Sequence, residues 1–330
     1  MPKLSICMPT YNGASYIEET LNSIFNQSLQ DFEIVISDDC STDDTVKILK
    51  GINDSRFKIF LNDKNLGYGR NLQVIWRKAS SDIIFLMGQD DILLKDALLN
   101  AYNAFSLDRD VGVITRPYYW FDTDFRKPVR AVKPFNPYKD SVISIFDGNN
   151  EFYKIFESVG QLSGLAYLKK YIEIDFHEDT FPAHIYPFAG ITREHKVVFL
   201  KDYIVAVRIE SSQTRFKTRI YDVPPTLSWV NMFKSVFREE KFNEFRKKGI
   251  KQISKNFVGL IQIKNYSTIR NLLREILILI KIRPLNLLDP RFWFFSISTL
   301  VIPRRFLIYL VDKLKGKVLS RGLKDIVVNY

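Results

Sequence analysis

Two pairs of adjacent aspartates stand out in this chain of 330 residues. Asp90 and Asp91 follow the apolar run at residues 83–87, and Asp38 and Asp39 follow "FEIVIS". Adjacent carboxylates repel each other, and a buried unpaired carboxylate is costly, so each pair requires a positive partner or water. Carboxylate oxygens suit Mg²⁺ or Mn²⁺, which binds one or two carboxylates together with phosphate oxygens. The pairs therefore predict a metal and phosphate site, although either pair alone is also typical of a turn or helix start.

The elements that position these residues alternate along the first 125 residues. The predicted strands are "LSIC", "FEIVIS", "FKIFL", "DIIFLM" and "VGVI", and helices are predicted through "SYIEETLNSIF", "RNLQVIWRKA" and "LKDALLNAYNAF". This order predicts an α/β fold with a mostly parallel sheet and helices on both faces. Ligands of such sheets bind beyond the carboxyl ends of the strands. We expect "PTYNG", "DDCSTD", "NLGYGRN" and "GQDD" to meet at one edge.

Local signals refine this outline. Ser15 with Glu18, and Ser41 with Asp44, have the spacing of a capping box at a helix start. Residues 122–150 are rich in Pro, Asn and Asp and predict a long loop, often a binding loop or lid. A helix near 149–159, a strand near "LSGLAYL", a helix near 182–194 and a strand in "KVVFLKDYIVAVRI" follow.

The charge divides the chain into two parts. Residues 1–210 hold 24 Lys and Arg against 29 Asp and Glu, whereas residues 211–330 hold 24 against 8. We expect an α/β domain at 1–212 and a basic helical region at 213–330. The longest uncharged run of that region, residues 292–303, is shorter than the roughly 20 residues that span a bilayer. Basic residues beside aromatic ones favour a helix in the membrane interface; packing against the sheet domain is the alternative, and nucleic acid ranks third.

Several classes of protein are excluded. "GYGRNL" has Leu72 where a dinucleotide-binding turn needs its third glycine, and no P-loop motif is present. Three histidines without an HExxH spacing argue against a zinc hydrolase. Cys7 and Cys40 have no CxxC partner, which favours a reducing compartment. The amino-terminal apolar run is too short for a signal peptide, so a cytoplasmic protein is expected.

The residues of the predicted edge carry a family resemblance. The stretch "LSICMPTYNGASYIEETLNSIFNQSLQDFEIVISDDCSTDDT" resembles the amino-terminal signature of the family 2 glycosyltransferases of the GT-A fold. "NLGYGRN" resembles their Asn-x-Gly-x-x-x-Arg-Asn segment, and "FLMGQDD" stands where their DXD-type motif stands. The likeness is dense over residues 3–120 and thins towards 210. It implies an inverting enzyme of bacterial cell-surface polysaccharide synthesis that uses a nucleotide-diphosphate sugar and Mg²⁺ or Mn²⁺.

The resemblance also implies roles for individual residues. Asp39 would accept a hydrogen bond from the imide N–H of the base, Asp90 would face the ribose or the metal, and Asp91 would bind the metal. Family members often read Asp-x-Asp-Asp here, whereas this chain has Gly88 at the first position. The base itself would be lined by Pro9, Thr10 and Tyr11.

Two further roles are less specific. Arg70 opens the helix after "NLGYG" and could bond a phosphate or a base edge; an exposed helix arginine is the alternative. Inverting members use a later carboxylate as general base, and Asp179 matches best. Glu178 and His184 are rivals, and the two carboxylates could also simply cap the helix that follows.

The sequence therefore predicts an inverting glycosyltransferase, peripheral on the cytoplasmic face of a membrane. Its partners would be a nucleotide-diphosphate sugar and a glycan or lipid-linked acceptor, with no nucleic acid. One alternative is a catalytically inactive membrane-bound scaffold of the same fold. The other is a sugar-nucleotide nucleotidyltransferase, which needs a glycine-rich loop with Lys or Arg near the first strand, and "PTYNGAS" lacks it.

Overall fold

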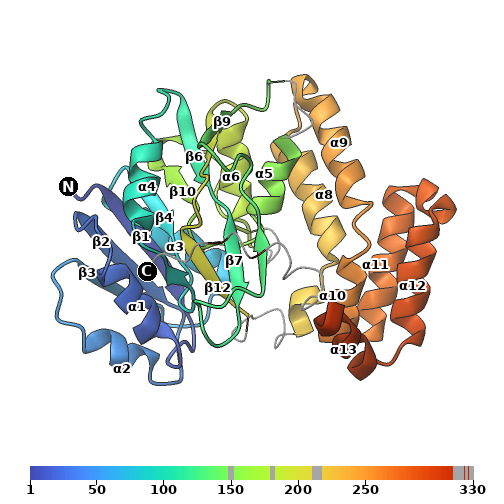
Figure 1. The fold of residues 1–330 in the computed structure, drawn as a ribbon, viewed down its shortest axis with the longest axis horizontal. Coiled ribbons are helices and arrows are strands. Elements are labelled where there is room, and N and C mark those ends of the chain that lie inside the picture. Colours follow the sequence, from blue (N-terminus) through green and yellow to red (C-terminus); the bar gives the residue numbers. More distant parts are fainter. Residues whose placement is uncertain (148–151, 179–182, 210–217, 315–322, 324–325, 327–330) are drawn as a thin grey trace. The chain divides into compact units, whose positions relative to one another are not determined.

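The computed structural model describes residues 1–147, 152–178, 183–209 and 218–314, with Leu323 and Ile326 (Figure 1). The described chain forms two compact units. The first is built from residues up to 209 with those two near the carboxyl terminus, and the second from residues 218–314. The predicted base, Asp179, lies outside the described residues.

The first unit is organised by an eight-stranded sheet in the order β3-β2-β1-β4-β10-β6-β11-β9. Strands β3, β2, β1 and β4 run parallel, whereas β10 is antiparallel to both of its neighbours and β9 is antiparallel to β11. The predicted mostly parallel α/β sheet is confirmed. Its strands are β1 Leu4–Thr10, β2 Phe32–Asp38, β3 Phe57–Leu61, β4 Ile83–Leu86, β6 Val111–Thr115, β9 Ser141–Ile143, β10 Ala166–Leu168 and β11 Lys196–Phe199.

Helices cover both faces of this sheet because side chains alternate along each strand. Leu4, Ile6 and Met8 of β1 share one buried cluster with helices α1 and α4. Helix α3 contacts β1 and β2, and its buried Leu72 and Ile75 lie outside that cluster, on the other face. The helices of this unit are α1 Ile17–Phe25, α2 Thr45–Lys50, α3 Tyr68–Lys78, α4 Ala97–Ala104, α5 Phe152–Ser158, η1 Lys169–Tyr171 and α6 Ile185–Thr192.

A second, four-stranded sheet corrects the prediction of one strand in "KVVFLKDYIVAVRI". The chain turns after β11, and β12 joins the other sheet, in the order β5-β12-β7-β8. Both strands are buried, so one apolar run conceals two elements. The predicted loop at 122–150 likewise contains β8 and β9. The strands of the second sheet are β5 Ile92–Leu93, β7 Tyr118–Phe121, β8 Arg130–Val132 and β12 Val205–Arg208.

The two predicted capping boxes are wrong. Helix α1 starts after Tyr16, and no side chain caps it. Helix α2 starts after Asp44, again with no capping side chain. The hydroxyl of Ser41 instead donates to Asp38 Oδ2 at 2.7 Å. A carboxylate three residues earlier, at the end of β2, therefore takes the hydroxyl that the local pattern assigned to the helix.

The second unit is helical and has its own core. Helix α10 contacts α11, α12 and α13, and the cluster between them includes Leu260, Leu272 and Phe292. Among the described helices of the chain, none is long and apolar enough to cross a membrane. The helices of this unit are η2 Thr218–Tyr221, α8 Pro225–Val236, η3 Glu240–Phe242, α9 Asn243–Ile253, α10 Gly259–Tyr266, α11 Ile269–Ile282, η4 Pro284–Leu288, α12 Pro290–Val301 and α13 Arg304–Leu314.

The structure explains why glycine is present at positions 67 and 69 of "NLGYGRN". Gly67 has φ of +86°, in the region that favours glycine. A Cβ on Gly69 would lie 2.0 Å from the carbonyl oxygen of His177 and 2.9 Å from the Cα of Glu178. The backbone at 177–178 can therefore reach the start of α3 only because residue 69 has no side chain.

We predict that Gly69→Ala lowers the free energy of unfolding by about 1–3 kcal/mol, because the added methyl group meets backbone that cannot rotate away. The matched control is Gly259→Ala at the start of α10, where a Cβ has nothing within 4 Å. That change should leave stability unchanged or raise it by up to about 1 kcal/mol. Urea unfolding followed by tryptophan fluorescence measures both, and equal midpoints would contradict the assigned contact.

Candidate active site

The predicted meeting of four loops at one sheet edge is observed. Thr10, Asp38 and Leu61 stand side by side in the register of β1, β2 and β3, so the loops that follow leave the sheet together. The segment after β4 joins them, because the backbone N–H of Tyr11 donates to Gln89 Oε1 at 2.8 Å and Gln89 Nε2 returns a bond to the Tyr11 carbonyl at 3.1 Å. The side-chain amide of Gln89 thus connects the loops after β1 and β4.

The loops after β1 and β2 are held in unusual backbone conformations. Asn12 and Cys40 have φ of +49° and +64°, which few residues other than glycine adopt. The N–H of Asn12 donates to Ser41 Oγ, and the N–H of Thr42 donates to Asn12 Oδ1, each at 2.8 Å. Such strain persists only where surrounding contacts enforce it, and it is common at functional sites.

Asp38 and Asp39 have different surroundings. Asp38 Oδ2 accepts from the hydroxyls of Thr10 and Ser41, each at 2.7 Å, and Oδ1 accepts from the Ser41 N–H at 2.8 Å. Asp38 is 1% exposed and acts as a connection between strands. Thr10 is equally buried, so its hydroxyl serves this framework.

Asp39 instead organises the loop before α3. Its Oδ1 accepts from the N–H of Leu66 at 2.7 Å and from Asn62 Nδ2 at 3.0 Å, and its Oδ2 accepts from the N–H of Gly67 at 2.8 Å. A carboxylate oxygen can accept two hydrogen bonds. Within the described part of the chain Oδ1 therefore has both positions filled, whereas Oδ2 can accept one more donor.

Asp90 and Asp91 converge on the position next to Gly88. A Cβ on Gly88 would lie 3.1 Å from Asp90 Oδ1, 3.2 Å from Asp91 Oδ2 and 3.1 Å from Ser163 Oγ. Asp91 is 6% exposed; its Oδ2 accepts from Ser163 Oγ at 2.5 Å and its Oδ1 from the N–H of Arg208 at 3.0 Å. Asp90 is half-buried. The oxygens of both carboxylates thus surround one point.

The positive charge beside this pair comes from two buried arginines. Arg208, at the end of β12, donates through Nε to the Asp90 carbonyl at 3.1 Å and pairs with Glu19. Arg116 is fully buried and donates to the carbonyls of Ser158, Gln161 and Ser163 at 2.7–2.9 Å. Burial lowers the pKa of Arg116 to about 10, so its guanidinium stays protonated at pH 7. It therefore fixes the segment that carries Ser163 and also offsets carboxylate charge.

The arginines offset this charge only in part. Burial and the neighbouring Asp90 carboxylate raise the pKa of Asp91 to about 7, against the lowering effect of the bonds from Ser163 and Arg208 and of the Arg116 charge. At neutral pH the site therefore favours one more positive charge.

A divalent cation fits these donors. The two carboxylates are hard oxygen ligands, and the cradle next to Gly88 brings an oxygen of each to one point. Within the described ranges no cluster of three or more His, Cys, Asp or Glu could hold a metal ion. A cation bound here would thus complete its shell with phosphate or water oxygens, as Mg²⁺ and Mn²⁺ do in nucleotide sites.

His184, a rival for the general base, is buried in a hydrogen-bonded pair. Its Nε2 lies 2.9 Å from the carbonyl oxygen of Val159, so Nε2 carries the proton, and its Nδ1 accepts from Tyr68 Oη at 3.1 Å. Burial lowers the pKa of His184 to about 4. Both ring nitrogens are therefore occupied, and the imidazole is neutral.

The remaining predicted residues lie at the rim. Arg70, in the first turn of α3, pairs with Glu178 Oε2 at 2.9 Å, and both side chains are more than half exposed. Pro9 and Tyr11 are half-buried at the end of β1 and just beyond it. The structure thus places Glu178 beside Arg70 at the edge where the other site residues meet.

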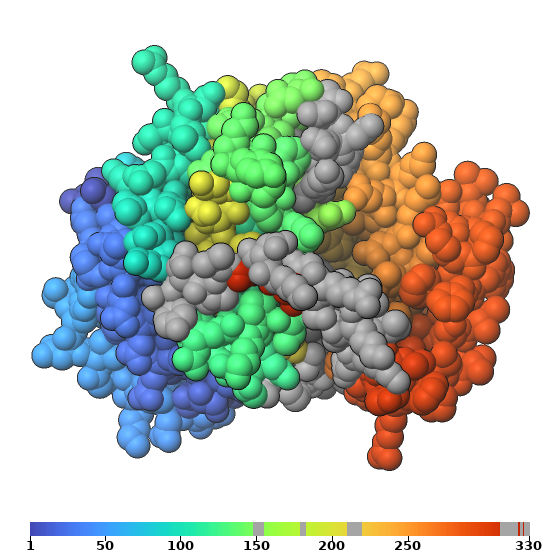
Figure 2. Space-filling view, in the orientation of Figure 1, coloured from blue at the N-terminus to red at the C-terminus, as the bar shows by residue number. Residues whose placement is uncertain are grey.

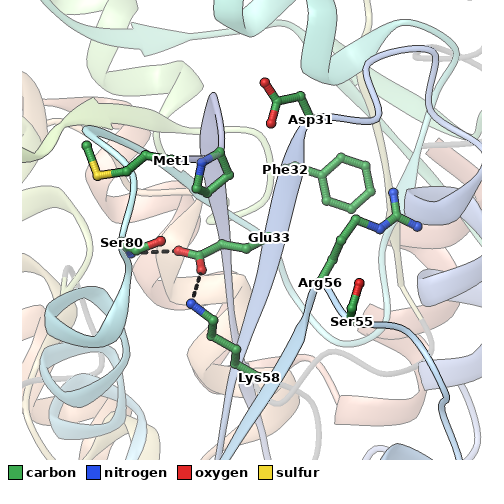
Figure 3. A pocket seen from close by; sticks show the side chains of 9 residues that line it. Met1, Asp31, Phe32, Glu33, Ser55, Arg56, Lys58 and Ser80 are labelled. Atoms are coloured by element: carbon green, nitrogen blue, oxygen red, sulfur yellow. Dashed lines mark hydrogen bonds and ion pairs between the residues drawn. The ribbon is translucent and has the colours of Figure 1, made fainter.

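A hollow near the amino ends of β1, β2 and β3, opposite the candidate site, is lined by side chains that bond to one another. Figure 3 shows Glu33 and Lys58 between Met1 and Arg56. Glu33 accepts from Lys58 Nζ and from the N–H of Ser80, each at 2.6 Å. Burial would raise the pKa of Glu33, but hydrogen bonds, led by that from Lys58, lower it to about 2. The carboxylate is thus satisfied by the protein itself, and the hollow is structural.

Comparison with known proteins finds a family match over the part of the chain that holds Asp39 and Asp91. The profile described as Glycosyl transferase family 2 matches residues 5–164, which include both aspartates. Residues 5–164 form a glycosyl transferase family 2 domain. A Campylobacter jejuni relative, the GalNAc(5)-diNAcBac-PP-undecaprenol beta-1,3-glucosyltransferase, is 39% identical over 101 residues, which is 30% of this chain and 33% of that protein. The chain spans 33–42% of the length of the first curated relatives it matches.

Two solved structures share the fold of this chain. Residues 1–349 of Staphylococcus aureus TarS in complex with UDP have a TM-score of 0.62 at 17% identity, covering 98% of this chain and 90% of that fragment. The Pyrobaculum calidifontis mannosyltransferase PcManGT, in complex with GDP-Man and Mn²⁺, has a TM-score of 0.54 at 16% identity, covering 91% of this chain and 86% of its own. The likeness establishes the GT-A architecture.

Sequence reasoning about this family 2 glycosyltransferase missed the two arginines, although a signal was present. Arg116 directly follows the strand "VGVIT", and Arg208 lies within the apolar run "IVAVRI". A cation at the end of a buried strand needs a polar partner, as an aspartate does there. Arg208 lies beside Asp90 and Asp91 because β12 pairs with β5, and the sequence pattern does not predict that pairing.

We predict that acidification destabilises the protein partly through His184. Its pKa is lowered on folding, so between about pH 6.5 and about pH 4 the unfolded state binds a proton that the folded state excludes, and stability is lost as the pH falls. In His184→Gln this contribution of about 2 kcal/mol should disappear. Urea unfolding of both proteins at pH 7.5 and pH 4.5 measures it. An equal loss in parent and variant would show that His184 is not held neutral.

Proposed function

We propose that the protein is an inverting glycosyltransferase that moves a sugar from a nucleotide-diphosphate sugar to a hydroxyl of a glycan or lipid-linked acceptor. The observation that carries this proposal is the convergence of Asp90 and Asp91 next to Gly88, at the edge that also holds Asp39. The family match supports a glycosyltransferase, and the TarS complex with UDP supports a nucleotide donor.

In this proposal the donor lies across the edge of the sheet. Asp39 Oδ2 accepts the imide N–H of the base through its remaining acceptor position, with the base against the half-buried Pro9 and Tyr11; the buried Thr10 supports this edge from behind through Asp38. Asp90 and Asp91 would hold Mg²⁺ or Mn²⁺, and a cation bound there would supply positive charge for the diphosphate. The neighbour that binds GDP-Man with Mn²⁺ supports such a metal.

Proton removal is assigned to a carboxylate of residues 178–179. The acceptor oxygen attacks the anomeric carbon, its proton passes to the base, and the bond to the diphosphate breaks on the opposite face. We assign the base to Asp179. The occupied ring nitrogens of His184 argue against that rival. Glu178, paired with Arg70, is better suited to keep that arginine in reach of the diphosphate.

We place the reaction at the cytoplasmic face of a membrane. The relative named for an undecaprenol-linked substrate supports a lipid-linked acceptor, and the basic charge after residue 210 supports attachment to anionic lipid. A nucleotidyltransferase is not favoured, because the loop after β1 lacks the glycine-rich sequence with Lys or Arg. The inactive scaffold would be identified by an absence of donor turnover in the parent protein.

The metal site is tested by Asp91→Asn. We expect turnover, measured as hydrolysis or transfer over a panel of UDP-, dTDP-, GDP- and CDP-sugars with Mn²⁺, to fall below detection, because a ligand charge is lost. In EDTA at pH 8 the free energy of unfolding of the variant should exceed that of the parent by roughly 1–3 kcal/mol, since a buried charge with a raised pKa opposes folding above about pH 7. Loss of activity with a gain in stability excludes misfolding.

Asp44→Asn is the matched control, because that carboxylate is exposed at the start of α2. It should keep the parent's activity. If Asp91→Asn retains parental turnover, the metal assignment is wrong. If the parent itself turns over no donor and shows no thermal shift with any of the four nucleotides and Mn²⁺, the scaffold is the correct description.

The base is tested by Asp179→Asn, which should lower turnover by about 10²–10⁴-fold, the usual contribution of a general base. Nucleotide affinity, measured by calorimetry, should change little. Glu178→Gln is the comparison, and we expect it to act mainly on donor affinity through Arg70. A large loss of turnover in Glu178→Gln, with none in Asp179→Asn, would move the base to residue 178.

A further inference from the structure

Helix α12 has its apolar side chains on the outside. Trp293, Phe294 and Val301 are 45%, 67% and 73% exposed, whereas Ser296 and Thr299 are buried. The Thr299 hydroxyl is satisfied within the helix, donating to the carbonyl of residue 295 at 2.7 Å. A surface helix in water shows the opposite arrangement, with its polar residues outward. The outer side of α12 is therefore suited to a medium other than water.

Helix α11 repeats this inversion. Leu273 and Leu277 are 46% and 64% exposed, whereas Asn271 and Glu275 are buried. Asn271 Nδ2 donates to Ser267 Oγ at 3.0 Å, so at least this inward polar group has a partner. The inversion on two successive helices differs from the normal case, in which single apolar residues are scattered over the surface.

The two helices direct these side chains away from a shared core. Leu272 and Leu279 of α11 and Phe292 of α12 join one cluster with α10, and the turn between the helices, η4, exposes Leu288 at 79%. Figure 1 shows the ribbons of α10, α11 and α12, and Figure 2 shows the surface of α11 and α12 in orange to red. We call the outward residues the apolar face: Leu273, Leu277, Leu288, Trp293, Phe294 and Val301.

The four adjacent aromatic residues 292–295 lie in the region whose sequence favours a helix in the membrane interface. The structure divides them. Phe292 is 0% exposed and belongs to the core, and only Trp293 and Phe294 are largely exposed. The helical period is the reason, since adjacent residues point about 100° apart.

Basic residues border the apolar face. Arg270, Arg274 and Lys281 are exposed on α11. They lie within about 60° of Leu277 around the helix at 100° per residue. Residues 218–314 as a whole hold 18 Lys and Arg against seven Asp and Glu. An apolar stripe beside a basic stripe is the pattern of a helix lying in the interface of an anionic bilayer.

We propose that the apolar face docks on anionic lipid, with Trp293 and Phe294 entering the headgroup boundary and Arg270, Arg274 and Lys281 pairing with lipid phosphates. A second copy of the chain fits less well, because it would bring the same cations against these. The proposal deepens the proposed function in one respect, by naming the surface that brings the enzyme to a lipid-linked acceptor. The docking itself does not depend on the reaction.

The test is flotation of the full chain with vesicles of phosphatidylcholine alone or mixed equally with phosphatidylglycerol. We expect binding to the anionic vesicles that weakens with salt. Arg270→Glu with Lys281→Glu should weaken it at least about 30-fold, since each cation near such a surface contributes about fivefold. Lys248→Glu with Lys251→Glu, the same charge change on α9, should weaken it several-fold less.

A second readout locates the face. Acyl-brominated lipid should quench the parent's tryptophan fluorescence, and Trp293→Phe should lose that quenching while still floating. Trp293→Ser with Phe294→Ser should lose flotation, and Leu107→Ser, another exposed apolar residue, should keep it. The proposal is overturned if the parent does not float, if face and control variants float alike, or if sedimentation shows a dimer that the face variants dissociate. Donor hydrolysis in detergent reports separately on the proposed function.

Discussion

The structure of the site depends on two buried arginines, Arg208 and Arg116, that hold the backbone around Asp90 and Asp91. Two adjacent carboxylates at the end of a buried strand would repel each other and lose hydration. Arg208 supplies a backbone N–H to Asp91 and its guanidinium to the carbonyl of Asp90, and Arg116 fixes the segment that carries Ser163. These partners reduce the cost of the pair without removing it, since the pKa of Asp91 stays raised. A site that still favours positive charge is one that a cation with its phosphate ligands can complete.

The opposite end of the same edge follows a different principle. Asp39 is held by main-chain N–H groups of Leu66 and Gly67 and by the Asn62 amide, so its carboxylate shapes the loop before α3. That loop in turn requires glycine at 67 for its backbone angle and at 69 for the approach of residues 177–178. Asp39, Gly67 and Gly69, which belong to the family's sequence motifs, thus also have a structural role. They allow the start of α3 and the backbone of residues 177–178 to approach the edge of the sheet.

The helical unit shows how burial and hydropathy can be reversed within one chain. Helices α11 and α12 bury polar residues such as Asn271 and Thr299 and expose Leu277 and Phe294. In the first unit, by contrast, Leu4, Ile6 and Met8 all face the core. The helical unit therefore exposes apolar side chains on helices that bury polar ones, whereas the first unit keeps its apolar strand residues inside. This is consistent with the opposite charge balance of the two parts.

The sequence by itself determined the architecture of the first unit, because alternating strands and helices admit few arrangements and place the loops with Asp39, Asp90 and Asp91 at one edge. It did not determine which groups satisfy those carboxylates. Neither predicted capping box forms, because no side chain caps either helix and the Ser41 hydroxyl bonds Asp38 at the end of the preceding strand. The single strand predicted at 196–209 is divided between two sheets. Local patterns report which residues avoid water. Only the tertiary structure decides which hydrogen-bond donor reaches which buried acceptor, because those partners, such as Arg208 and Asp91, are more than a hundred residues apart and meet only through strand pairing.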